Sequence, residues 1–142
     1  MATSQNGWPL DPARSVRTPG NSDAHIVVAD GPAGDLLMYV ATQFDMRVED
    51  LELPGAEDEW GYAHRTIGGT STWSNHASAT AVDLNATRHP QGRRGTFNTN
   101  QVAQINAILG ECEGLVRWGG HYSGTVDEMH FEIVGNYAQV AD

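Results

Sequence analysis

The sequence predicts an α+β fold in which two main helices flank a small antiparallel sheet. Residues 80–85 alternate apolar Val82 and Leu84 with smaller or polar positions, which is the period-2 pattern of a half-buried strand. Residues 32–44 instead place apolar side chains three to four positions apart, as on one face of a helix. The order of such segments along the chain is that of a mixed α+β fold.

The first half of the chain is expected to begin with an irregular lead-in over residues 1–24, which are rich in Pro, Gly, Ser, Asn and Asp. Residues 25–29 form a short apolar run that predicts a strand. Pro32 follows a turn and suits the first position of a helix that runs to about Phe44. Residues 46–53 and 60–67 are further candidate strands, separated by the Pro54-Gly55 turn.

The second half of the chain predicts one helix and two more strands. Asn98 or Thr99 can cap a helix that ends near Gly110 and faces the core with Val102, Ile105, Ile108 and Leu109. Residues 115–118 and 129–134 predict strands around a Gly-rich connection at residues 119–124. We therefore divide the chain into a lead-in, residues 1–24, and a single domain, residues 25–142, and expect a monomer.

Composition and charge argue against several classes of protein. A chain of 142 residues, 39% apolar and 18% charged, suits one soluble domain with its own core. Its net charge of −10 argues against nucleic acid as a partner, because phosphate binding needs clustered Lys and Arg. No secretory signal and no membrane-spanning run is visible, so we expect no membrane partner. Cys112 is the only cysteine, so it cannot form an intramolecular disulfide, and we interpret it as structural.

Six acidic residues surround the Pro54-Gly55 turn. We interpret this run as a solvated loop, which is the ordinary role of a charge run. Its acids are Glu49, Asp50, Glu52, Glu57, Asp58 and Glu59.

Two short segments hold the residues that can carry chemistry. His76 precedes the strand predicted at residues 80–85, Asp83 lies within it, and His130 lies in the strand predicted at residues 129–134. Two imidazoles and one carboxylate can bind Zn²⁺ and leave a fourth position for water, as in catalytic zinc sites. Single histidines are ordinarily surface residues or hydrogen-bonded core residues, and we interpret His25 and His89 in that way.

Asp127 and Glu128 are alternative bases for a water at such a site. Asp127 lies three residues before His130, whereas strict strand alternation would place Glu128 on the same face as His130. Glu132 also shares the His130 face and is either a neighbour of the site or an ordinary strand residue.

The spacing Ser-x-His-x-x-x-x-Ala-x-Asp followed by Asp-x-x-His-Phe-Glu resembles the zinc D-alanyl-D-alanine carboxypeptidases. It equally resembles their L-alanyl-D-glutamate endopeptidase relatives, many of which are bacteriophage endolysins. Two further segments fit: residues 61–65, Gly-Tyr-Ala-His-Arg, and residues 117–120, Arg-Trp-Gly-Gly. The resemblance covers roughly residues 60–133. The chain departs from it at Ala79, where the family has Gly; a positive φ there would strain Ala.

The resemblance implies that His76, Asp83 and His130 bind one Zn²⁺. It also implies that Asp127 is the general base and that Arg65 holds the substrate carbonyl and the oxyanion that develops on it. The implied substrate is the stem peptide of bacterial peptidoglycan. Other residues that could contact substrate or a metal ligand are Ser74, Trp73, Trp118, His64, His121, Glu128 and Glu132.

Three functional hypotheses remain at this stage. The first is a zinc peptidase of the phage endolysin type, made in the host cytoplasm and acting on the cell wall after release, since no signal peptide is visible. The second is a catalytically silent binding module, as in hedgehog domains of the same fold. The third is a virion-associated protein with a vestigial site. Which stem-peptide bond would be cut, L-Ala–D-Glu or D-Ala–D-Ala, is left open.

Overall fold

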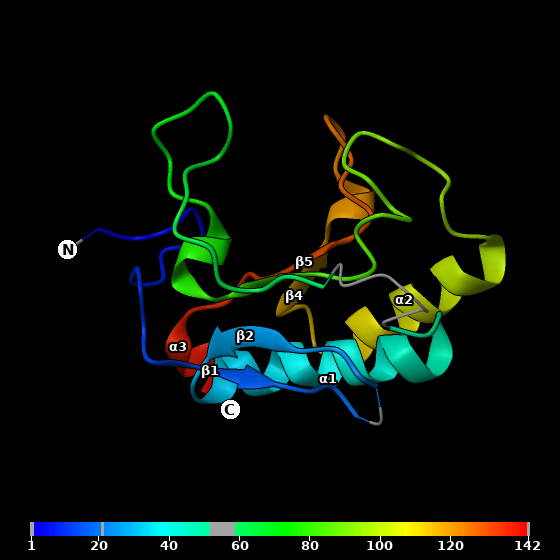
Figure 1. The fold of residues 1–142 in the computed structure, drawn as a ribbon, viewed down its shortest axis with the longest axis horizontal. Coiled ribbons are helices and arrows are strands. Elements are labelled where there is room, and N and C mark those ends of the chain that lie inside the picture. The colour runs from blue at the N-terminus through cyan, green and yellow to red at the C-terminus, as the bar shows by residue number, and fades with distance from the viewer. Residues whose placement is uncertain (1, 21, 52–58, 142) are drawn as a thin grey trace.

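The computed structural model describes residues 2–20, 22–51 and 59–141, and it is an α+β fold with two small antiparallel sheets and two main helices (Figure 1). The elements in chain order are β1 Arg14–Arg17, β2 Ile26–Ala29, α1 Pro32–Arg47, η1 Asn75–Ser78, β3 Ala81–Asp83, α2 Thr99–Glu111, β4 Val116–Trp118, η2 Gly119–His121, β5 His130–Ile133 and α3 Tyr137–Ala141. The fold class predicted from the sequence is therefore confirmed.

The two sheets are both antiparallel but differ in size. β1 and β2 form a two-stranded ribbon, and β3, β5 and β4 form a three-stranded sheet with β5 in the centre. In the register of the larger sheet Asp83 pairs with His130, and Glu132 pairs with both Ala81 and Arg117. The central strand β5 therefore presents His130 and Glu132 beside polar residues of both neighbouring strands.

Helix α1 supplies the base of the core beneath these sheets (Figure 1). Pro32 lies in its first turn, as predicted, and its apolar stripe is buried. Phe44 on this stripe makes edge-to-face contacts with Phe131 of β5 and with Phe97, at ring-centroid distances of 6.0 and 5.9 Å. These contacts place the floor of the larger sheet directly on α1.

Helix α2 begins where the sequence predicts. The Asn98 side chain accepts a hydrogen bond from the Gln101 backbone, and the Gln101 side chain accepts one from the Asn98 backbone, which is a capping box. Gly110 lies inside the last turn rather than after it, because the helix continues to Glu111. Cys112 follows and is buried, with its pKa raised to about 11 by burial and by Glu111, which agrees with a structural role.

Several expected elements are wrong. Residues 46–47 belong to α1 and residues 48–51 form no strand, while residues 52–53 and the Pro54-Gly55 turn lie outside the described residues. Residues 60–67 form no strand either, and make only single bridges through Trp60 and Thr66. The lead-in is not irregular throughout, because β1 lies within it and extends the ribbon of β2. Whether each of these segments becomes a strand depends on its pairing with distant parts of the chain, and local periodicity carries no information on that pairing.

The acidic run is only partly a solvated loop. Glu49 is half-buried and its carboxylate bonds to His89 Nε2 at 2.6 Å and to the Asn85 amide at 2.8 Å. Glu59 is buried as well, whereas Asp50 is exposed. Glu52, Glu57 and Asp58 lie outside the described residues. His89 is the hydrogen-bonded core histidine that the sequence suggested.

Across the described ranges, we find no helix with the length and apolarity needed to cross a membrane.

Candidate metal site and its pocket

His76 lies on η1, a turn that short-range contacts fix at both ends. The Ser74 hydroxyl at its start accepts a hydrogen bond from the His76 backbone N–H at 3.1 Å. Ala79 ends it in the left-handed conformation, with φ 55° and ψ 32°. Ala79 therefore has the positive φ at which the sequence comparison anticipated strain, and this bend leads the chain directly into β3.

The pairing of β3 with β5 brings the other two candidate ligands to His76. His130 Nδ1 lies 3.0 Å from Asp83 Oδ1, and His76 Nε2 lies 3.3 Å from Asp83 Oδ2. One ligand atom from each of the three residues lies within 4.8 Å of the other two, and all three residues are buried. The structure thus brings together the three residues that the sequence singled out.

The remaining ring nitrogen of each histidine is held by a hydrogen bond. His76 Nδ1 lies 2.6 Å from the Gly61 carbonyl oxygen, and because a carbonyl only accepts, Nδ1 must carry the proton. His130 Nε2 lies 2.7 Å from Glu132 Oε1, which also accepts a hydrogen bond from the Tyr122 hydroxyl at 2.7 Å. These contacts direct His76 Nε2 and His130 Nδ1 toward Asp83, as outer contacts orient metal-binding histidines.

Charge is stabilised inside this cluster despite its burial. Burial disfavours the Asp83 carboxylate, but hydrogen bonds from His130 and His76 outweigh that effect and hold its pKa well below the usual range. Burial also disfavours charge on His130, whereas its bonds to Asp83 and Glu132 raise its pKa well above the usual value. Without a bound cation, His130 is therefore itself a cation between two carboxylates.

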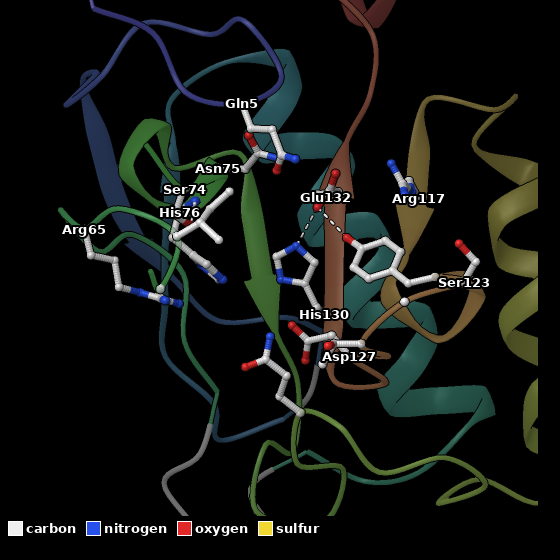
Figure 2. Close-up of a pocket in the computed structure, with 16 residues that line it drawn as sticks. Gln5, Arg65, Ser74, Asn75, His76, Arg117, Ser123, Asp127, His130 and Glu132 are labelled. Carbon is white, nitrogen blue, oxygen red and sulfur yellow. Dashed lines mark hydrogen bonds and ion pairs between the residues drawn. The ribbon is translucent and has the colours of Figure 1, made fainter. Parts of the chain in front are cut away.

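Asp127 lies in the turn before β5, not in the strand. Its carbonyl accepts a hydrogen bond from the His130 backbone N–H at 3.0 Å, and this turn breaks the alternation that the sequence suggested. The turn packs against Gly119, where a Cβ would lie 2.1 Å from the Asp127 carbonyl oxygen. Only glycine at position 119 allows so close an approach, and it leaves the Asp127 carboxylate beside His130 (Figure 2).

The Asp127 carboxylate is partly buried and poorly solvated. Its Oδ1 is buried and accepts no hydrogen bond within the described part of the chain. Burial, assisted by the nearby Asp83 carboxylate, raises its pKa to about 6, although His130, His76 and Arg65 act in the opposite direction. A buried polar atom without a partner at such a place is typical of a functional site.

Glu128, the alternative base, points away from the site. Its carboxylate accepts hydrogen bonds from the Gly95 and Thr96 backbone N–H groups at 3.1 and 2.8 Å and from the Thr96 hydroxyl. Its carbonyl accepts the Trp118 indole N–H at 2.8 Å. Glu128 therefore holds the loop at residues 95–96 against the sheet, while Asp127 lines the pocket.

His76 and His130 of this cluster line a pocket of about 400 Å³. Arg65 and Asp127 line it from opposite sides (Figure 2). Arg65 is exposed and makes no ion pair or side-chain hydrogen bond with any described residue, so its guanidinium is available to a ligand. The pocket therefore presents one free cation and one poorly solvated carboxylate on either side of the candidate ligands.

The other predicted contacts divide into two groups. Ser74 and Glu132 line the pocket. Four aromatic candidates do not: His64 bonds to Asp11 and packs on Trp73, and His121 packs on the buried Trp118. Trp73, Trp118, His64 and His121 therefore do not line this pocket, and neither does Glu128; a contact of any of them with substrate stays a prediction.

Several pocket residues were missed by the sequence analysis. Arg117 alternates with buried Val116 and Trp118, so its exposure on the Glu132 face could have been read from strand period alone. Its guanidinium lies over the Tyr122 ring at 4.5 Å. Asn75, the neighbour of His76, also lines the pocket. Gln5 and Gln91 line it too, and no local pattern marks them, because distant segments bring them there.

The donor set fits a metal ion. Two imidazole nitrogens and one carboxylate oxygen suit Zn²⁺ and leave a coordination position for water, which is the arrangement of catalytic metal sites. The unpartnered Asp127 oxygen beside the cluster is a suitable acceptor for a proton of such a water. Such a set of residues is typical of metal-dependent hydrolases.

Comparison with known proteins agrees with this class. Residues 68–133 match the sequence model of the family described as D-alanyl-D-alanine carboxypeptidase. The matched stretch spans just under half of the chain and contains the three candidate ligands and Asp127, but not Arg65. Neither curated proteins nor solved structures give a significant match. The family match supports a peptidase, and hence a hydrolase.

Proposed function

We propose that the protein is a zinc-dependent peptidase that hydrolyses an amide bond in the stem peptide of bacterial peptidoglycan. The observation that carries the proposal is the convergence of His76, Asp83 and His130 in one buried cluster, whose two histidines line a pocket together with Asp127. The family match supports the same reaction class. A phage endolysin that reaches the wall after release from the host is the biological role that we propose with it.

Each pocket residue has a role in this reaction. A bound Zn²⁺ would polarise the scissile carbonyl and lower the pKa of water to about 7. Asp127 accepts the proton of the attacking water and passes it to the leaving amine, for which a pKa near 6 is well suited. Arg65 faces the negative charge that grows on the carbonyl oxygen, and it is free of other partners for this purpose.

The presence of Asp127 and Arg65 favours an enzyme over a silent binding module. A binding module needs neither an unpartnered carboxylate nor a free cation beside its metal ligands. Arg65 and Arg117 also give the pocket two cations in a chain of net charge −10, which suits a peptide that carries carboxylates.

The test is digestion of purified peptidoglycan, with and without chelator, followed by mass spectrometry of the fragments. New amino termini on D-Glu would assign an L-Ala–D-Glu endopeptidase, and released D-Ala would assign a carboxypeptidase. Asp127→Asn should lower the rate by roughly 10²- to 10⁴-fold while zinc stays bound, since it removes the base but no ligand.

Asp23→Asn is the matched control, because Asp23 is an exposed carboxylate remote from the pocket and should keep full activity. Zinc-loaded protein that binds peptidoglycan fragments but cuts none would reject the enzyme in favour of a binding module. Near-normal rates in Asp127→Asn would instead remove Asp127 as the base.

A further inference from the structure

The N-terminal segment, residues 4–11, lies outside the family-matched region but is bonded directly to the elements that carry the candidate ligands. The Ser4 hydroxyl donates to the Ser78 hydroxyl at 2.7 Å, at the end of η1. The Asn6 backbone N–H donates to Asn75 Oδ1 at 2.9 Å, and the Asn6 amide donates to the Thr80 hydroxyl at 2.9 Å. The segment is therefore attached to the turn that holds His76.

The same segment makes further hydrogen bonds to β5, to η1 and to residues 62–64. The Asn6 amide donates to the Ile133 carbonyl of β5 at 2.9 Å, and the Asp11 backbone N–H donates to the Ala77 carbonyl at 2.9 Å. The Asp11 carboxylate bonds to the Tyr62 hydroxyl at 2.6 Å and to His64 at 2.9 Å. Hydrogen bonds to β5, to η1 and to residues 62–64 thus fix the segment in one place.

Gln5 lies between these anchors and is the one residue of the segment that lines the pocket. Its backbone N–H donates to the Trp73 carbonyl at 3.0 Å, which fixes its main chain. Its side chain is exposed and makes no hydrogen bond to any residue in the described ranges. Figure 2 shows Gln5 at the same end of the pocket as Asn75, away from Asp127.

We propose that Gln5 is a substrate-binding residue that selects a peptide main chain at the end of the pocket away from Asp127. A neutral carboxamide offers one acceptor and two donors in a plane, which matches the donor and acceptor of a peptide group. Because the flanking anchors hold its main chain, little backbone freedom is lost when substrate binds. This inference rests on the proposed peptidase function, because Gln5 would add a substrate contact to the pocket of that peptidase.

The experiment compares Gln5→Ala, Gln5→Glu and Thr3→Ala in the full-length zinc-loaded protein, with a soluble stem-peptide muropeptide as substrate. Gln5→Ala should raise KM about 3- to 10-fold, the range that loss of one neutral hydrogen bond gives, and leave kcat within about twofold. Gln5→Glu should raise KM further, since it loses the donors and adds a negative charge that repels a peptide carrying carboxylates. Thr3→Ala is the control, because Thr3 is exposed just before the segment but does not line the pocket.

Equilibrium binding separates this inference from the reaction itself. Calorimetry of the same muropeptide with Asp127→Asn, alone and combined with Gln5→Ala, measures affinity without turnover. The expected result is a weaker affinity by the same factor as the rise in KM, with unchanged zinc content and thermal midpoint.

The inference is overturned if KM and affinity of Gln5→Ala stay within about twofold of the parent protein. It is also overturned if Gln5→Ala loses zinc or thermal stability, because the residue would then be structural. If the wild-type protein binds the muropeptide without cutting it, the proposed peptidase function fails, and the calorimetric comparison still decides the role of Gln5.

Discussion

Asp127 is a single residue whose placement lowers the stability of the folded chain and suits the base that we propose it to be. Its carboxylate is mostly buried, lacks a partner for Oδ1 among the described residues, and lies near the acidic Asp83. A carboxylate in such surroundings is less stable ionised than in water, so its folded-state pKa is raised to about 6 from 3.8. Unfavourable solvation of this kind is common where a base must act near neutral pH.

This placement predicts that Asp127→Asn stabilises the metal-free protein at neutral pH. The folded pKa is higher than the unfolded one, so ionisation costs stability as pH rises from about 4 to about 6, and asparagine avoids that cost. The partly exposed site is screened by solvent. We expect a rise in midpoint of roughly 2–4 °C at pH 7, which corresponds to about 1 kcal/mol at this size.

Thermal unfolding of chelator-treated protein at pH 4 and pH 7 checks the expectation. The difference between the two proteins should shrink strongly at pH 4, where the folded Asp127 carboxyl is almost fully protonated. A variant that is less stable than the wild type at pH 7 would contradict the unfavourable environment assigned to Asp127.

At the scale of elements, a short turn and a short strand pair fix the candidate ligands. η1 and Ala79 place His76 at the start of β3, and the β3–β5 register places Asp83 opposite His130, 47 positions later in the chain. Glu132, two residues along β5, holds the far side of the His130 ring. The β3–β5 backbone hydrogen bonds therefore fix the geometry of the site, with little freedom left to the side chains.

The backbone conformation of this turn leads us to expect that glycine at Ala77 and glycine at Ala79 change the stability of the protein by different amounts. Ala77 and Ala79 are both fully buried, so glycine removes one methyl group from each position. Only Ala79 has a positive φ, and glycine relieves about 1 kcal/mol of strain there. Ala77→Gly should destabilise by about 1–2 kcal/mol, whereas Ala79→Gly should be close to neutral.

Urea unfolding of the two variants measures this difference directly, with each serving as the control for the other. Equal losses of stability would mean that Ala79 is not strained. Zinc affinity of Ala79→Gly should stay near that of the wild type, since its backbone conformation is preserved.

At the scale of the whole molecule, the candidate ligands are not part of the hydrophobic core that supports the sheet. Phe44 of α1, Phe97 and Phe131 pack beneath the sheet, and the candidate ligands lie above. Inside the cluster the Asp83 carboxylate offsets the His130 cation. The protein should therefore fold without metal, and metal binding should add stability to an already folded chain.

This arrangement predicts that zinc raises the thermal midpoint more at pH 7.5 than at pH 5.5. Zinc must displace the proton that Asp83 and Glu132 stabilise on His130, so acid weakens binding. At 1,000 times its Kd, zinc adds about 4 kcal/mol to the free energy of unfolding. Thermal unfolding with zinc and with chelator at both pH values measures the effect.

His76→Ala is the control, because it removes one ligand and should abolish the zinc-dependent shift. A zinc-dependent shift that His76→Ala retains would remove His76 from the ligand set. Unfolding on chelation alone would contradict a core that is independent of the site.

The sequence by itself determined the elements with strong local patterns and the residues that lie within them. Pro32 and the apolar stripe specified α1, Asn98 and Gln101 specified the start of α2, and the spacing around His76, Asp83 and His130 indicated the cluster. These signals are local, because the periods of helices and strands and the caps of helices act over a few residues.

Only the tertiary structure decided which distant segments complete the site. Gln5 reaches the pocket because its neighbour Ser4 bonds to Ser78, a separation of 74 positions that no local pattern records. Asp127 rather than Glu128 likewise lines the pocket because of the turn packed against Gly119, which the strand period does not predict. Such contacts join segments that are far apart in the sequence, and they form because the folded chain packs those segments together. They can therefore be recognised only once the fold is known.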